Sequence, residues 1–124
     1  MVTCSCLCGG VTFDVKHDGT ATACHCSQCR KQSGHFWASG VGKVDNFKIT
    51  GDVTWFSASA TAKRGFCPTC GSFLFWKHND ESTMSFSLGL IDGASGLKLQ
   101  RHIFTDDKGD YYALDDGVDT RGQW

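Results

Sequence analysis

The chain has 124 residues, of which 40% are hydrophobic and 20% are charged, and its formal net charge at pH 7 is −1. This composition is typical of a globular protein, and we expect one domain over residues 1–124. A near-neutral charge without basic runs gives no reason to expect nucleic-acid binding. No stretch approaches the roughly 20 apolar residues of a membrane-spanning helix, so we expect no association with a membrane.

Eight cysteines suggest both the compartment and the chemistry. No targeting segment is visible after Met1, so we expect a cytoplasmic protein, in which thiols stay reduced. Under reducing conditions closely spaced cysteines indicate metal ligands more often than disulfides. A secreted domain held together by disulfides is the less favoured alternative.

The first cysteines in the chain are Cys4, Cys6 and Cys8, which offer two possible C-x-C pairs. We favour Cys6 and Cys8 as metal ligands because Gly9 and Gly10 follow at once. A metal-binding turn needs the backbone freedom that glycine supplies. Cys4 is then a spare thiol, although it is also a candidate fourth ligand for another site.

Cys24, Cys26 and Cys29 place three thiols within six residues, and we call them the three-cysteine cluster. All three sulfur atoms can reach one point, and a soft divalent metal such as zinc is the usual reason for this spacing. Three protein ligands leave one tetrahedral position open, and open zinc sites can be catalytic. Residues 30–34 show no clear amphipathic period, so we predict a loop or a short helical turn there.

Cys67 and Cys70 form a C-x-x-C pair with Pro68 inside it and Gly71 after it. Proline presets φ for a tight turn and glycine tolerates positive φ, so the pattern predicts a zinc knuckle. A thioredoxin-like redox pair should open a helix, whereas the aromatic residues in 72–76 favour a strand. Together with the favoured N-terminal pair, this knuckle gives four ligands and a closed zinc site of structural type.

Elsewhere the pattern favours strands. Residues 57–62 are small and polar and predict a loop. The acidic residues in 106–119 do not fit a calcium loop, so we expect a solvated surface. We therefore predict an all-β domain with long loops. Alternating or aromatic composition predicts its strands at 11–15, 36–41, 47–50, 53–56, 72–76, 83–90 and 97–104.

Zinc bound by three or four thiolates is negatively charged, so both sites need nearby cations. Arg30 and Lys31 follow the three-cysteine cluster, and Lys63 and Arg64 precede the knuckle. Their placement beside the cysteines favours an electrostatic role over ordinary surface charge.

The open position can accept water, a carbonyl oxygen or a thiolate. The chain has one glutamate, Glu81, and neither H-E-x-x-H nor the deaminase motif, so hydrolysis lacks its usual carboxylate base. A thiolate substrate fits better because zinc is thiophilic and lowers the pKa of a thiol. His25, His35 and His102 are candidate acid–base groups, although a lone histidine is more often structural. The position of His25 between two ligands is compatible with a side chain that simply points outward.

Three segments, residues 6–11, 24–31 and 64–71, together resemble the glutathione-dependent formaldehyde-activating enzyme family. Their order and approximate separation match the family pattern. Residues 90–92 and 102–112 also resemble its C-terminal part, so the similarity covers nearly the whole chain. The most specific element is the three-cysteine cluster followed by an Arg-Lys pair.

The resemblance implies an Mss4-like (β-tent) all-β fold and two zinc ions per chain. We expect the second ion to be the more labile one, because three ligands hold zinc less firmly than four. It implies a carbon–sulfur lyase that joins formaldehyde to glutathione as S-hydroxymethylglutathione, so the expected partners are a small-molecule thiol and an aldehyde. On this basis Arg30 and Lys31 would hold the anionic peptide. The implied ligands are Cys6, Cys8, Cys67 and Cys70 for the structural zinc and Cys24, Cys26 and Cys29 for the second zinc.

Two other functions remain open from the sequence. A non-catalytic, zinc-stabilised binding module would hold two structural zinc ions, and a fourth protein ligand on the second zinc would favour it. A repair enzyme of the methionine sulfoxide reductase kind would need a reactive cysteine outside the metal sites, and Cys4 is the only spare one.

Overall fold

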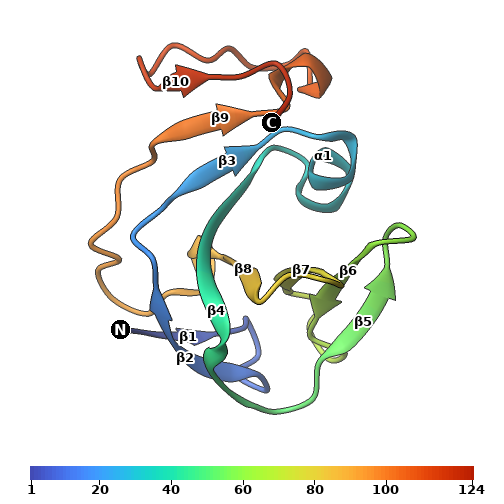
Figure 1. Ribbon diagram of the computed structural model, residues 1–124, viewed down its shortest axis with the longest axis vertical. Helices are drawn as coiled ribbons and strands as arrows, with labels where there is room; N and C mark the ends of the chain where they lie inside the picture. The colour runs from blue at the N-terminus through green and yellow to red at the C-terminus, as the bar shows by residue number, and fades with distance from the viewer.

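The computed structural model describes residues 1–124 and contains a ten-stranded sheet, one α-helix and two 3₁₀ turns (Figure 1). The predicted all-β fold with little helix is confirmed, and no helix is long and apolar enough to cross a membrane. The elements are β1 (Val2–Ser5), β2 (Thr12–His17), β3 (Thr22–Cys24), α1 (Ser27–Ser33), β4 (Trp37–Thr50), β5 (Thr54–Ser57), β6 (Ala62–Phe66), β7 (Phe73–His78), β8 (Thr83–Ser87), η1 (Leu88–Leu90), β9 (Arg101–Ile103), η2 (Thr105–Asp107) and β10 (Asp119–Thr120).

The long strand β4 is the element on which the others assemble. It pairs with β2, β3 and β8, and the main path through the sheet runs β10-β9-β3-β4-β8-β7-β6-β5. The two strands predicted at 36–41 and 47–50 are therefore one continuous strand. Two glycines in β4 allow its neighbours to approach closely, because a Cβ on Gly40 would lie 2.9 Å from the Phe86 ring and one on Gly42 would lie 2.8 Å from Val15.

The main hydrophobic core lies between β2, β4 and the β7–β8 pair, in the lower part of the molecule as drawn in Figure 1. Alternation along the strands directs Phe13, Val15 and Phe86 into it, and Phe75 joins them; each is at most 2% exposed. The Phe13 and Phe75 rings lie 4.9 Å apart, a distance typical of packed aromatic pairs. Cys6 and Cys67 belong to this core, whereas Cys24 and Cys29 lie in a second, smaller core with Trp37 and Ile103.

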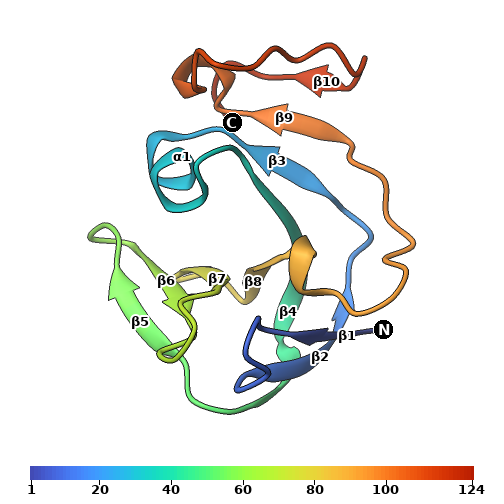
Figure 2. The same cartoon turned by 180° about the vertical axis from the view of Figure 1, so that it is seen from behind.

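The upper part of the molecule is built from segments far apart in sequence. β9 pairs with β3 in parallel, and β10 pairs with β9 in parallel. Figure 2 shows the C-terminus beside these strands and the N-terminus at the opposite end, near the β1–β2 hairpin. The strands predicted at 97–104 and 83–90 are shorter than expected, since the first is extended only over Arg101–Ile103 and the second ends at Ser87 in a 3₁₀ turn.

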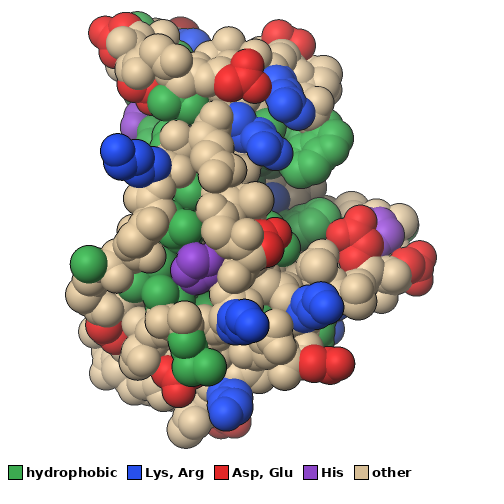
Figure 3. Space-filling view, turned by 60° about the vertical axis from the view of Figure 1, so that its left-hand side comes forward, with side chains coloured by type: hydrophobic (Ala, Val, Ile, Leu, Met, Phe, Trp, Pro, Cys, Tyr) green, Lys and Arg blue, Asp and Glu red, His purple; other side chains and the backbone are tan.

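The surface carries no extended basic patch on the face seen in Figure 3. Positive and negative side chains are interspersed there, in keeping with the near-neutral net charge. Hydrophobic side chains gather in a recess between the upper and lower parts of the molecule (Figure 3).

Candidate metal centres

Two turns bring four cysteines together at the lower end of the molecule. The turn after β1 carries Cys6 and Cys8, and the turn between β6 and β7 carries Cys67 and Cys70. Their four sulfur atoms all lie within 4.8 Å of one another, and we call them the four-cysteine cluster. Cys8 Sγ lies 3.7 Å from the sulfurs of both Cys6 and Cys67. Zinc–sulfur bonds of about 2.3 Å in a tetrahedron separate the sulfurs by roughly 3.8 Å, so this cluster fits zinc.

Backbone amides surround the sulfurs of the four-cysteine cluster. The Gly10 and Val11 amides donate to Cys8 Sγ and Cys6 Sγ at 3.3 and 3.2 Å. Hydrogen bonds from Ser72 lower the pKa of Cys70 to about 5. Gly71 has a φ of 76°, a left-handed conformation that glycine adopts without strain, and its amide donates to the Cys67 carbonyl. The knuckle geometry thus follows from its sequence.

The three-cysteine cluster lies where β3 meets α1. Cys24 ends β3, Cys26 is the N-cap residue of α1, and Cys29 lies in its first turn. The three sulfur atoms lie within 4.8 Å of one another and also suit zinc. Cys26 Sγ accepts a hydrogen bond from the Cys29 amide at 3.3 Å, and Gly34, with a φ of 76°, ends the helix. These capping residues explain a helix where the sequence predicted a loop or a short helical turn.

The three thiols differ in their exposure and acidity. Cys24 and Cys29 are 9% and 1% exposed, whereas Cys26 is half-buried. Hydrogen bonds from Cys24 and Cys29 lower the pKa of Cys26, and the same contacts raise the pKa of Cys24. Cys26 is therefore the most exposed residue of the cluster and the one whose pKa is lowered.

Arg64 supplies the positive charge beside the three-cysteine cluster. Its guanidinium nitrogens lie 3.6 and 3.7 Å from Cys29 Sγ, and the side chain is only 6% exposed. Two side-chain oxygens on α1 hold it in place, Gln28 Oε1 at 3.0 Å and Gln32 Oε1 at 2.9 Å. In the sequence Arg64 lies just before the knuckle. In the structure Arg64 lies on β6, and its side chain contacts the three-cysteine cluster instead. A buried guanidinium without a carboxylate partner is suited to a negatively charged thiolate cluster.

Arg30 and Lys31, the two cations after the three-cysteine cluster, lie in different surroundings. Arg30 Nε donates to the Asp107 carbonyl at 3.3 Å and so holds the η2 turn. Lys31 is exposed and lines a cavity of about 380 Å³ between α1 and the β5–β6 hairpin. Phe56, Phe66 and Arg64 also line this cavity, which therefore adjoins Cys29 through the guanidinium. Arg30 is not among the residues that line it.

Aromatic side chains form the surroundings of the three-cysteine cluster. Trp37, Phe73, Trp76 and Phe104 pack against its buried part. Phe104 is the one non-glycine residue with a positive φ, at 54°, in a conformation that costs on the order of 1 kcal/mol. Such backbone strain is commonly found at functional sites. These aromatic walls limit the access of water to the sulfurs.

The three candidate histidines all lie near the C-terminal segment. His25 does not point to solvent: it is fully buried, and burial is the main cause that lowers its pKa to about 4. His25 Nε2 lies 2.9 Å from His102 Nδ1, and His102 Nε2 lies 2.8 Å from Asp116 Oδ2. Tyr112 Oη lies 2.5 Å from His25 Nδ1, and exposed His35 packs edge-on against the Tyr112 ring.

This chain of hydrogen bonds fastens the C-terminal segment behind the three-cysteine cluster. Adjacent residues of an extended chain face opposite sides, so His25 lies on the face away from Cys24 and Cys26. The predicted solvated surface at 106–119 is thus correct for most side chains, but Tyr112 and Asp116 are tied to buried histidines. Tyr112 and Asp116 are far from the cysteines in sequence, so no local pattern predicted their contacts with the buried histidines.

Cys4, the spare thiol, lies in the main core with no exposed surface. Burial raises the pKa of Cys4 to about 12, so the thiol stays protonated. No fourth cysteine, histidine or carboxylate joins the three-cysteine cluster. Cys4 therefore belongs to the packing of the core and is not a ligand of that cluster.

These features define an all-β protein with one four-cysteine cluster and one three-cysteine cluster, both suited to zinc. Residues 1–107 match the family described as glutathione-dependent formaldehyde-activating enzyme, and the chain belongs to that family.

Two known proteins are similar to the chain. An uncharacterized lyase of Schizosaccharomyces pombe, C29B12.13, is 25% identical over 111 residues, which cover 87% of this chain and 81% of the relative. A crystal structure of a Rhodobacter sphaeroides protein superposes with a TM-score of 0.65 at 21% identity, covering 75% of this chain and 90% of the other. The second similarity supports the fold alone.

Proposed function

We propose that the protein is a zinc-dependent carbon–sulfur lyase that joins a thiol such as glutathione to formaldehyde or a related small aldehyde, with residues 1–124 acting as one domain. The observation that carries this proposal is a three-cysteine cluster with a buried guanidinium beside it and a lined cavity next to it. Membership of the family and the similarity to a lyase support the reaction class.

The reaction needs no redox partner and releases no leaving group. The thiol sulfur attacks the carbonyl carbon, one carbon–sulfur bond forms, and the carbonyl π bond becomes a hydroxyl group that gains the proton lost by the thiol. Zinc held by Cys24, Cys26 and Cys29 would supply a Lewis acid and a thiophilic position when bound. The four-cysteine cluster would hold a structural zinc.

The residues around the cluster have separate tasks in this proposal. Arg64 balances the negative charge of the thiolates and fixes Cys29. Lys31 binds a carboxylate of the thiol substrate in the 380 Å³ cavity, whose Phe56 and Phe66 walls accept its apolar part. Arg30 acts indirectly, because its bond to the Asp107 carbonyl holds the turn that follows Phe104.

The alternative of a non-catalytic binding module lacks the support it would need, since no fourth protein ligand joins the second cluster. The repair-enzyme alternative depends on Cys4. A buried thiol with a raised pKa is a poor nucleophile, so this alternative is not favoured either.

The test is the rate of adduct formation between glutathione and formaldehyde, followed by NMR exchange spectroscopy with the zinc-loaded protein. We expect a rate above the spontaneous one, lost in Cys26→Ser and retained in Cys4→Ala. An unchanged rate with glutathione and with every other thiol tried would overturn the lyase proposal.

A further inference from the structure

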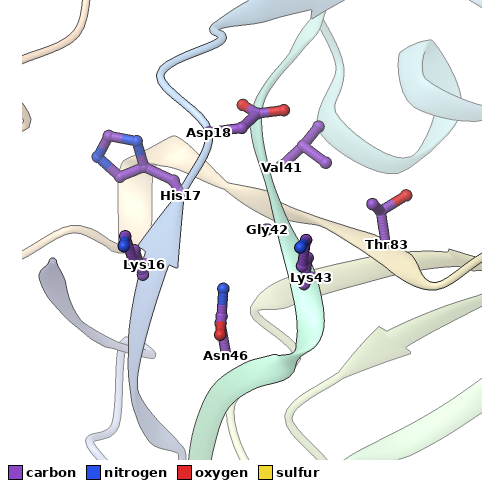
Figure 4. Close-up of a pocket in the computed structure, with 8 residues that line it drawn as sticks. All are labelled: Lys16, His17, Asp18, Val41, Gly42, Lys43, Asn46 and Thr83. Atoms are coloured by element: carbon purple, nitrogen blue, oxygen red, sulfur yellow. The ribbon is translucent and has the colours of Figure 1, made fainter.

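A hollow on the β2–β4 face is separate from both cysteine clusters, and we propose that it binds a small organic anion carrying carboxylate or phosphate groups. The hollow has a volume of about 520 Å³, within the range of small-molecule sites. It shares no residue with either cluster, so the proposal is independent of the lyase function. Its lining residues are Lys16, His17, Asp18, Val41, Gly42, Lys43, Asn46 and Thr83 (Figure 4).

Two lysines supply the positive charge of the hollow. Figure 4 shows Lys16 on β2 and Lys43 on β4 at its two sides, with Asn46 between them. The ion pairs of the structure are His102 with Asp116 and Arg121 with Asp119, so neither lysine forms an ion pair with a carboxylate. Two unpaired ammonium groups on adjacent strands can together hold a ligand with one or more anionic oxygens.

His17 adds a directed donor to the two ammonium groups. Its Nδ1 accepts a hydrogen bond from the Gly19 amide at 3.1 Å. The neutral ring therefore carries its proton on Nε2, which is free to donate. Asn46 and Thr83 contribute an amide and a hydroxyl that make no hydrogen bond within the chain.

The single carboxylate of the hollow, Asp18, has one oxygen engaged by Thr20, and the two lysines outweigh its charge. Asp18 Oδ1 accepts from the Thr20 amide at 2.9 Å and from the Thr20 hydroxyl at 2.6 Å. A divalent cation such as calcium needs six or more oxygen ligands and would be repelled by two ammonium groups. Donors and charge thus favour an anion over a metal ion.

The backbone explains why these donors converge. The pairing of β2 with β4 shifts register between Val15 and His17 and resumes at His17 opposite Gly42. Between these two pairs β2 has only Lys16 whereas β4 has residues 43–46, so the extra residues of the bulge lie on β4 and include Lys43 and Asn46. Since Val15 and Gly42 are packed into the core beneath, the frame of the hollow is rigid before a ligand arrives.

The experiment is a titration of the ¹⁵N-labelled protein with sodium phosphate and, separately, with sodium succinate, at an ionic strength kept constant with sodium chloride. We expect saturable amide shifts centred on residues 16–18 and 41–43 with at least one probe. The probe that binds more tightly distinguishes a phosphate ligand from a carboxylate ligand.

A charge-matched pair of variants completes the test. Lys16→Gln/Lys43→Gln should weaken binding by at least roughly tenfold, because it removes two charge-assisted hydrogen bonds. Lys48→Gln/Lys98→Gln removes two exposed lysines outside the hollow and should bind as the parent does. The proposal is overturned if neither probe gives saturable shifts there, or if both double variants bind equally well. Loss of adduct formation would affect the lyase proposal alone.

Discussion

The two cysteine clusters use the same ligand atom but receive different electrostatic support. In the four-cysteine cluster, backbone amides of Gly10 and Val11 and the groups of Ser72 donate to sulfur. In the three-cysteine cluster one amide, that of Cys29, donates to Cys26 Sγ, and the guanidinium of Arg64 lies beside Cys29 Sγ. The Gly10 and Val11 amides belong to the same turn as the cysteines that they contact. Arg64 instead comes from β6, a strand separate from the three cysteines, and it also lines the neighbouring cavity. The comparison separates a cluster that joins two turns from one that adjoins a cavity through Arg64.

The largest difference should appear when one ligand of each cluster is removed. Structural zinc contributes on the order of 10 kcal/mol to small zinc domains, comparable with the whole stability of a typical domain. We therefore expect Cys67→Ser to abolish cooperative thermal unfolding, measured by circular dichroism. Cys26→Ser should keep a cooperative transition and bind one zinc fewer. If both variants unfold alike, the two clusters do not differ in this way.

Chelation should separate the same two clusters by rate. We expect two zinc ions per chain by native mass spectrometry, falling to one on mild chelation, because three ligands hold zinc less firmly than four. The ion that leaves should come from the three-cysteine cluster, with exchange at least roughly tenfold faster than at the closed site. Two ions that leave together, or two that both resist removal, would contradict this difference.

Arg64 provides a sharper test of the electrostatic comparison. Arg64→Met should weaken zinc binding at the three-cysteine cluster by roughly 10- to 100-fold, as outer partners of metal ligands commonly do. Competition with a chromogenic chelator measures the effect. Lys63→Met is the matched control, because Lys63 lies next to Arg64 on β6 but contacts the Trp55 ring. Equal losses in the two variants would point to general charge rather than to the contact with Cys29.

The smallest expected effect concerns the two cations of α1. Lys31→Ala should raise the KM for glutathione by about tenfold with kcat nearly unchanged, because one charge-assisted hydrogen bond is lost. Arg30→Ala should change the thermal stability of the protein more than its KM, since Arg30 bonds to the Asp107 carbonyl. Steady-state kinetics of the two variants would show a reversed order if Arg30 rather than Lys31 meets the substrate.

The sequence predicted the grouping of the cysteines because the grouping depends on local spacing. C-x-C, C-x-x-C and the adjacent glycines determine which sulfurs can meet within a turn. Most long strands were also predicted, since alternation marks a half-buried strand. The short strands β1, β3, β6 and β10 were missed, because two to five residues give only a weak period and none of the four is as rich in aromatic residues as β5 or β7.

Contacts between distant segments could not be predicted from the sequence. Arg64 follows Cys29 by 35 residues, and only the pairing of β6 with β7 and the packing of α1 bring the two together. The burial of His25 and His102 depends on the parallel pairing of β3 with β9. Nothing local to a histidine distinguishes a buried one from an exposed one such as His35.

The parallel pairing of β3 with β9 also affects the order in which the chain can fold during synthesis. All ligands of the four-cysteine cluster have been made once Cys70 leaves the ribosome. Cys24, Cys26 and Cys29 are made much earlier, yet Ile103 and Phe104, which pack against them, come near the end of the chain. Contacts of such large sequence separation form slowly. The three-cysteine cluster is therefore synthesised early but is covered by its packing residues late. During synthesis the chain passes through a stage in which the four-cysteine cluster is complete and the three-cysteine cluster is still open to solvent.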